Sequence, residues 1–126
     1  MTRKYRKKSE KAKLKLKLNK LWSEIVRSKG VCEYCGRTEF LNAHHHYGKR
    51  AESTRWDLDN GVCLCPACHV YSSVFSAHQT PADFCRWIEK KRGKAWATRL
   101  RKKHSEVVKY SVEDLEKLLE ELENDR

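Results

Sequence analysis

The residues best suited to chemistry are cysteines and histidines gathered between positions 32 and 69. A Cys-x-x-Cys sequence lies at each end of this segment. Three consecutive histidines and an Asp-Asn-Gly sequence lie between them, and a further histidine follows the last cysteine. Thiolate sulfur and imidazole nitrogen are donors that zinc and related transition metals accept in proteins. The segment therefore predicts a metal-stabilised centre in which thiolates serve structure and imidazoles serve chemistry.

The stronger signal comes from four cysteines at paired spacing: Cys32, Cys35, Cys65 and Cys68. Each pair can wrap one ion, and Gly36 permits the tight turn that this requires. Two unrelated thiol motifs or a redox pair are the alternative, but such motifs rarely coincide in a short intracellular chain. We therefore expect a structural Zn²⁺ that contributes directly to folding. Cys63 and Cys85 lack a spaced partner and are expected to be buried as small apolar residues, although Cys63 could compete for the zinc.

The histidine run is the second signal. His44, His45 and His46 end a predicted strand that begins at Phe40. Because successive side chains on a strand point to opposite faces, His44 and His46 should share one face and His45 the other. One of them could instead be a zinc ligand and the others exposed polar residues. Since four cysteines already complete a tetrahedral set, we expect the imidazoles to be free for other work.

The elements that must position these residues form a small α+β domain. A second strand over Val62–Leu64 would pair with the first as an antiparallel hairpin, and Asn60-Gly61 has the composition of a hairpin turn. A helix is predicted to begin after Cys68 and to carry four more residues: His69, Tyr71, Val74 and Phe75.

Helices are predicted on both sides of this core. An apolar stripe predicts a helix over residues 3–29, capped by Gly30, with Leu14, Leu18, Leu21, Trp22, Ile25 and Val26 on one side. A helix starts at Thr80-Pro81 and ends at Gly93, and another runs from Lys94 to about His104. The expected organisation is a basic N-terminal helix or arm (1–30), the zinc-stapled core (31–79) and a C-terminal helical region (80–126). That last region has a basic part (86–104) and an acidic amphipathic part (111–124).

Charge is distributed unevenly along the chain. The net charge is +11, with twelve Lys/Arg against two acids in residues 1–30 and ten against three in residues 80–109. Two basic flanks around a near-neutral centre favour a protein that grips a polyanion, and DNA ranks above a merely solvated basic surface. No apolar run approaches a membrane span, and no apolar run follows the basic N-terminal residues. We therefore expect the cytoplasm of a bacterium or of a phage-infected host, and no membrane association.

The order of the motifs resembles the HNH endonucleases, which have the ββα-metal fold. Ala43-His44-His45, Asp59-Asn60-Gly61 and Leu64-Cys-Pro-Ala-Cys-His69 follow that family's order, with fifteen residues from His45 to Asn60 and nine from Asn60 to His69. The two bracketing Cys-x-x-Cys pairs resemble the zinc-stapled form, and the sequence around the motifs resembles phage recombination nucleases of the NinG and Ref type. The likeness covers roughly residues 31–80.

The resemblance implies a role for each matching residue. His45 would be the general base, His44 and His69 would hold one divalent ion, and Asn60 would anchor the connecting loop. Hydrolysis of a phosphodiester needs a base near neutral pH and a cation that stabilises the developing charge, so the residue types fit these roles. Two imidazoles with water and substrate oxygens are compatible with Mg²⁺ or Mn²⁺ as the catalytic ion, and other divalent ions are possible. The resemblance implies products with 5′-phosphate and 3′-hydroxyl ends.

The chain departs from the family pattern at two positions. His46 stands where an apolar residue is usual, so His45 and His46 could be the ligand and base instead. Ser73 stands where some relatives have a third metal histidine, and His78 could add a ligand or a phosphate contact, although a surface role for His78, as for His104, is the simpler expectation.

Several basic residues are predicted to contact DNA phosphates: Lys49, Arg50, Arg55, Arg86 and Lys90. Trp56 could stack on a base, but core packing is the simpler expectation. The sequence thus predicts a metal-dependent DNA endonuclease. The alternatives are a non-catalytic zinc-ribbon DNA-binding or recombination-accessory protein, and a structural zinc module whose acidic C-terminal helix docks a partner protein.

Overall fold

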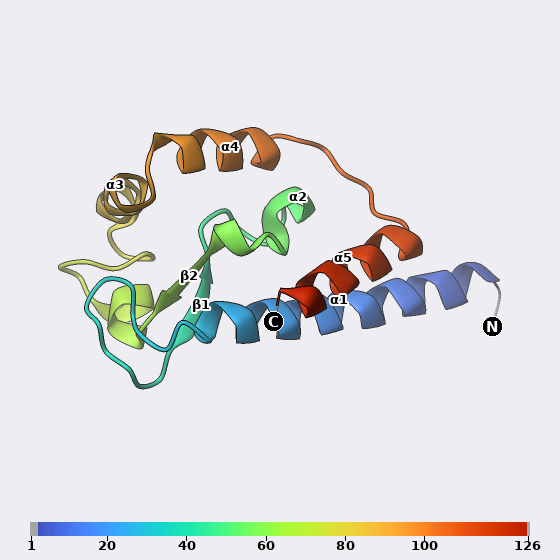
Figure 1. The fold of residues 1–126 in the computed structure, drawn as a ribbon, viewed down its shortest axis with the longest axis horizontal. Coiled ribbons are helices and arrows are strands. Elements are labelled where there is room, and N and C mark those ends of the chain that lie inside the picture. Colours follow the sequence, from blue (N-terminus) through green and yellow to red (C-terminus); the bar gives the residue numbers. More distant parts are fainter. Residues whose placement is uncertain (1–2, 126) are drawn as a thin grey trace.

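A two-stranded antiparallel hairpin lies between two groups of helices in the computed structural model (Figure 1). The structure describes residues 3–125, with side chains from residue 9 onward. In chain order the elements are α1 (Arg3–Arg27), β1 (Asn42–His45), α2 (Glu52–Arg55), η1 (Leu58–Asn60), β2 (Gly61–Leu64), η2 (Ala67–Tyr71), α3 (Pro81–Arg92), α4 (Lys94–His104) and α5 (Val112–Asn124). The small α+β fold with a two-stranded core is confirmed. No helix within residues 3–125 is long and apolar enough to cross a membrane.

The strands pair with Asn42 opposite Leu64 and His45 opposite Gly61. All of β2 is buried, because both of its faces are covered. Cys63 packs into an apolar cluster with α1 and α5, whereas Val62 and Leu64 pack into a second cluster with three of the paired cysteines and α3. The hairpin therefore separates two small cores, and adjacent residues of one strand belong to different cores.

Helix α1 covers one face of the hairpin through the predicted apolar stripe. Leu18, Leu21, Trp22 and Val26 are buried, and Gly30 has the positive φ of 78° expected of a residue that follows a helix. Helix α5 lies alongside α1 (Figure 1) and buries Leu115 and Leu122 in the same cluster. A capping box begins α5, since the Ser111 side chain accepts from the Asp114 N–H and the Asp114 side chain accepts from the Ser111 N–H. The leucine stripe of α5 is thus occupied by α1.

Helices α3 and α4 cover the other side and meet at Gly93, whose φ of +94° allows the sharp change of direction. Their basic residues hold the loop that leads into β2. The Arg92 guanidinium donates to the carbonyls of Asp59 and Gly61, at 2.9 and 2.8 Å, and Trp96 Nε1 donates to the Asp59 carbonyl at 2.9 Å. Lys103 Nζ lies 2.7 Å from the Asp57 carboxylate. Some of the basic side chains of these helices therefore bind groups of the protein itself.

Two predicted local structures are wrong. Asn60-Gly61 is not a hairpin turn: Asn60 ends η1, and Gly61 is extended (φ −98°, ψ 137°) as the first residue of β2. A Cβ at Gly61 would lie 2.4 Å from Val26 Cγ2 and 3.0 Å from Trp22 Cζ2, so this glycine permits close approach of α1. The helix after Cys68 is also shorter than predicted, because η2 ends at Tyr71 and leaves Val74 exposed in the following loop.

Three predictions about single residues also need correction. Thr80 precedes α3 as predicted, but its hydroxyl bonds to the backbone of Ser76 instead of capping the helix. Cys85 is only half-buried on α3 and lies near Glu89. His104 is half-buried and stacks on Tyr47 with ring centroids 4.1 Å apart, so it is not a free surface residue. Trp56 is buried in the α1 core, as expected.

Candidate metal centres and active site

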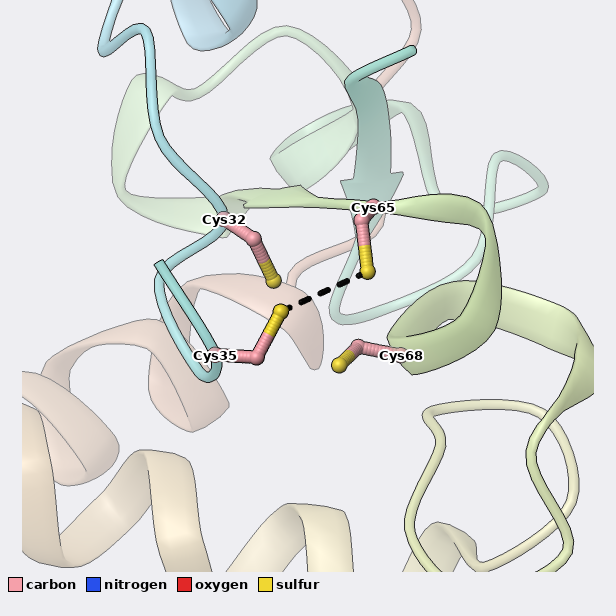
Figure 2. Close-up of side chains that lie close together, drawn as sticks. All are labelled: Cys32, Cys35, Cys65 and Cys68. Carbon is pink, nitrogen blue, oxygen red and sulfur yellow. Dashed lines mark hydrogen bonds between the residues drawn. The ribbon is translucent and has the colours of Figure 1, made fainter. Parts of the chain in front are cut away.

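Four cysteine side chains point toward one centre (Figure 2). The sulfurs of Cys32, Cys35, Cys65 and Cys68 all lie within 4.8 Å of one another, and Cys35 Sγ is 3.6 Å from Cys65 Sγ. Two sulfurs bound to one zinc at ~2.3 Å lie roughly 3.8 Å apart in a tetrahedral set. The cluster therefore has the donor number, donor type and spacing of a zinc site. Cys63 belongs to the opposite face of the hairpin and is not a member of it.

Local backbone structure sets the geometry of the first pair. The Gly36 N–H donates to the Cys32 carbonyl at 2.9 Å, with Gly36 at φ +79°, and the Cys32 N–H donates to the Arg37 carbonyl at 2.7 Å. The second pair spans the end of β2 and the start of η2. The cluster thus joins the segment that follows α1 to the strand and to the short helix.

Glu33 is a positioning residue that the sequence patterns did not reveal. Its side chain is 2% exposed and accepts a hydrogen bond from the Cys63 N–H at 2.8 Å. It also forms ion pairs of 3.0 Å with Arg92 and with Lys29. Burial raises the pKa of Glu33, but the Cys63 hydrogen bond and the two cations outweigh it and hold the pKa below its ordinary value. Glu33 therefore ties the first cysteine pair to β2 and α3. A single Glu between two cysteines does not indicate such contacts in the sequence.

The thiol acidities are those of a cluster that needs a cation. Burial raises the pKa of Cys32, but backbone hydrogen bonds from Cys35, Cys65 and Tyr34 lower it to about 7. Burial and the neighbouring sulfur of Cys65 raise the pKa of Cys68. One thiolate thus forms readily and disfavours the next, and a divalent ion at the centre would relieve this repulsion.

Three histidines form the second cluster. Ring nitrogens of His44, His69 and His78 all lie within 4.8 Å of one another, and His69 Nε2 is 3.2 Å from His78 Nε2. Two nitrogens bound to one ion at ~2.1 Å lie roughly 3.0 Å apart in octahedral and roughly 3.4 Å apart in tetrahedral geometry, so the spacing fits a shared metal. His44 and His69 are half-buried, whereas His78 is exposed. This cluster is more open to solvent than the cysteine cluster, in which three of the four residues are buried.

The third imidazole arrives through a loop and not through the helix. Ser73 lies beyond the end of η2, whereas the loop after it folds back so that Ala77 N–H donates to the Cys68 carbonyl and His78 N–H donates to the His69 carbonyl. The Gln79 amide bonds to the carbonyls of Val70 and Tyr71. The structure thereby brings His78, and not residue 73, to His44 and His69.

The surroundings of His44 and His69 disfavour the charged form of each imidazole. Burial, together with the nearby His69 and His78, whose charges would repel a charge on this ring, lowers the pKa of His44 to about 3. Burial likewise lowers the pKa of His69, with a contribution from His78. A neutral imidazole has a lone pair, which is the form that binds a metal.

His45 lies on the opposite face of the hairpin from His44. Its Nε2 donates to the Arg55 carbonyl at 2.9 Å, and its ring stacks on Trp22 with centroids 3.7 Å apart and planes 13° apart. A carbonyl oxygen only accepts, so the neutral ring carries its proton on Nε2 and its lone pair on Nδ1. Burial lowers the pKa of His45 to about 4, assisted by the charges of Lys49 and Arg55.

His46 does not join the histidine cluster. Its ring lies beside Trp96 and Tyr47, with centroids 5.3 and 4.9 Å away. Both His46 and His44 contact the Phe84 ring. Since His44 and not His45 lies beside His69, the geometry favours His44 over His45 as a ligand of this cluster.

Asn60 fastens the end of β1 to the start of β2. It is fully buried, its Oδ1 accepts from the Tyr47 N–H at 2.7 Å and its Nδ2 donates to the Tyr47 carbonyl at 2.9 Å. The Asn60 carbonyl accepts from the His46 N–H at 2.8 Å. These bonds fix the backbone directly after His45.

The five basic residues predicted to contact DNA differ in their freedom. Lys49, Arg50 and Lys90 are exposed, and Arg86 is exposed but pairs with Asp83 at 2.6 Å. Arg55 is half-buried over the Trp56 ring and lies 3.8 Å from Glu52. Lys49, Arg50 and Arg55 share a surface cavity of about 430 Å³.

Comparison with known proteins identifies the segment that carries both clusters. A scan against protein-family models matches residues 32–73 to the HNH endonuclease family. The matched segment contains all four paired cysteines as well as His44, His45, Asn60 and His69. Searches of curated proteins and of solved structures found no significant match. The finer likeness to the NinG and Ref type stays a prediction. The match supports a nuclease-type function and a metal-binding site. The resemblance is therefore confirmed over residues 32–73, the segment that matches the model of the HNH endonuclease family.

Proposed function

We propose that the chain is a metal-dependent DNA endonuclease that hydrolyses phosphodiester bonds. The observation that carries this proposal is the cluster of three imidazoles on one face of an HNH hairpin, with His45 held separately on the other. In the described part of the chain the sheet has only two strands, so the outer edge of β1 has no strand partner. A phosphate lying across this edge would face the metal ligands on one side and the base on the other.

The donor set favours a transition ion at the histidine cluster. Three imidazoles suit Zn²⁺, Ni²⁺ or Co²⁺ best; Mn²⁺ is the weakest binder of this first-row series, and Mg²⁺ prefers oxygen ligands. Of the two ions expected from the sequence, we therefore retain Mn²⁺ and rank Mg²⁺ below it. When bound, the ion supplies positive charge that stabilises the transition state and the leaving oxygen. His44, His69 and His78 would hold it, and the four cysteines would hold a structural Zn²⁺.

His45 is the proposed general base. Its Nε2–H donates a hydrogen bond to the Arg55 carbonyl, so the lone pair on Nδ1 can accept a proton from water. Asn60 would act by fixing the backbone next to this ring. Attack of the activated water on phosphorus would leave 5′-phosphate and 3′-hydroxyl ends.

Basic residues outside the clusters would hold the substrate. Lys49, Arg50 and Lys90 are exposed cations available to phosphates, and the basic α1 and α4 would extend the contact along the backbone. Affinity should fall steeply as salt rises, because phosphate contacts release counterions.

Plasmid cleavage tests this proposal. Purified protein with zinc in the cysteine site is incubated with supercoiled DNA in Mg²⁺, Mn²⁺, Co²⁺ or Ni²⁺, beside His45→Ala and His46→Ala. We expect cleavage by wild type and by His46→Ala and loss of cleavage in His45→Ala with DNA binding retained. Loss in His46→Ala alone would transfer the base to His46. DNA retention without cleavage in every metal would favour the non-catalytic DNA-binding or recombination-accessory alternative.

The partner-docking alternative loses its main support. It relied on an unoccupied leucine stripe in the acidic helix, whereas Leu115 and Leu122 of α5 are buried against α1.

A further inference from the structure

The proposed base is held by a residue outside the HNH segment. The Trp22 indole lies flat against the His45 imidazole, with ring centroids 3.7 Å apart and planes 13° apart. Trp22 belongs to α1, and the family match begins ten positions later, at residue 32. The contact therefore links the N-terminal helix directly to the site, although the helix carries none of the HNH motif.

Trp22 is itself fixed on several sides. It is 1% exposed, and its Nε1 donates to the Asp57 carbonyl at 2.9 Å. The Asp57 side chain is held by Lys103 of α4 at 2.7 Å. On the hairpin side the indole lies so close to Gly61 that a Cβ there would be 3.0 Å from Trp22 Cζ2. The indole is thus a rigid plate and not a flexible neighbour.

The two contacts of His45 restrain different motions. The hydrogen bond to the Arg55 carbonyl fixes the direction of Nε2. The second side-chain torsion of histidine has a broad energy minimum, so a single hydrogen bond leaves the ring plane free to swing. A flat aromatic surface against the ring removes this freedom. Together the two contacts fix both the position of Nδ1 and the direction of its lone pair.

We propose that Trp22 is a positioning residue for the nucleolytic reaction: its indole fixes the plane of the His45 ring so that Nδ1 faces the attacking water. This inference rests on the proposed endonuclease function. It makes α1 part of the working site, in addition to its role in the core and in DNA contact. A catalytic group displaced by about 1 Å can lower a rate on the order of 100-fold.

Two substitutions of similar volume isolate the flat ring from simple packing. Trp22→Phe and Trp22→Met both lose the bond to Asp57, but only Phe keeps an aromatic face. Leu18→Ala, one turn earlier in α1 and fully buried in the same cluster, controls for loss of stability. For each variant we would measure the single-turnover cleavage rate at saturating enzyme, the dissociation constant for DNA and the thermal midpoint.

We expect Trp22→Met to lower the single-turnover rate roughly 10- to 100-fold with unchanged DNA affinity, and Trp22→Phe to recover most of that loss. Leu18→Ala should lower the thermal midpoint while its folded fraction cleaves like wild type. Equal rates for Trp22→Met and Trp22→Phe would overturn the inference.

An NMR measurement does not depend on cleavage or on any Trp22 variant folding. The ring protons of His45, assigned by their loss in His45→Gln, should be shifted upfield in wild type by the indole ring current. Ordinary shifts for these protons would overturn the inference. If the upfield shift is present and wild type does not cleave DNA, the endonuclease proposal fails and the positioning role falls with it, whereas the stacked geometry stands.

Discussion

The two metal-ligand clusters lie close together in sequence and differ in every property that decides what a metal does. The cysteine cluster has four soft donors, three of them buried, and it joins three segments of the fold. The histidine cluster has three donors, and all of them retain some exposure to solvent. Structural zinc sites are closed by four protein ligands, whereas catalytic sites keep a position for water or substrate.

The alternation of side chains in the hairpin produces a second difference, between the two adjacent histidines of β1. Leu64 and Val62 face the cysteines and α3, while Cys63 between them faces α1. In β1 the same alternation sends His44 toward His69 and His45 toward Trp22. Two adjacent histidines thus acquire different surroundings without any change of element, as the proposed roles of ligand and base require.

The largest expected effect comes from opening the closed cluster. Cys65→Ser should abolish cooperative folding at neutral pH, because zinc binding by such a small, charge-rich domain is a large part of its folding free energy. Far-UV circular dichroism and zinc content measure the result. Cys63→Ser is the matched control, since it replaces a cysteine two positions before Cys65, on the opposite face of the hairpin, and should retain the zinc. A folded, zinc-free Cys65→Ser would show that the cluster is not structural.

Removing one ligand of the open cluster should affect activity and not folding. His44→Ala should reduce bound metal by the histidine-site ion and abolish cleavage, with the thermal midpoint changed far less than in the cysteine variant. His78→Ala should act in the same direction, and Ser73→Ala should have no effect because residue 73 lies outside the cluster. Equilibrium dialysis with Co²⁺ or Mn²⁺ gives the stoichiometry. If His78→Ala binds metal and cleaves like wild type, the cluster has only two ligands.

Asn60→Ala should affect both stability and activity to an intermediate degree. The substitution leaves the Tyr47 N–H and carbonyl without partners, which costs roughly 1–3 kcal/mol for each buried group. Cleavage should fall because the backbone after His45 is released, while both metals stay bound. Urea unfolding and single-turnover cleavage would be compared in one preparation. Wild-type stability would mean that water replaces the amide without loss.

The smallest effects should come from exposed cations. Lys49→Ala and Arg50→Ala should weaken DNA binding without changing the folded state, and each should reduce the slope of log affinity against log salt by about 0.9. Lys117→Ala, in the acidic α5, provides a control that should leave the slope unchanged. Binding titrations at several salt concentrations would reveal these slopes. Unchanged slopes for Lys49→Ala and Arg50→Ala would place the DNA elsewhere.

Much of the fold could be predicted from local patterns. The helices at either end have apolar stripes and caps in the sequence. The spacing of the cysteines is sufficient to predict that Cys32 and Cys65 lie in one cluster. What failed depends on contacts between distant segments. Asn60-Gly61 has the composition of a turn, whereas a glycine is required at position 61 because Val26 and Trp22 of α1 leave no room for a Cβ.

The candidate site shows the same limit. His44 and His69 are recognisable from spacing, but His78 reaches them through a loop whose fold is set by backbone bonds to Cys68 and His69. Glu33 and Trp22 gain their roles from partners 30 and 23 positions away, at Cys63 and His45. No periodicity or motif records such pairings.

The most direct test of the division between the two clusters follows metal content, folding and cleavage together as a chelator removes the ions stepwise. We predict that cleavage disappears with the first ion to leave, while circular dichroism changes only when the thiolate-bound zinc is removed, and that Mn²⁺ or Co²⁺ restores cleavage to the still-folded protein. Loss of cleavage and of structure in one step, with a single ion bound at the start, would contradict the account.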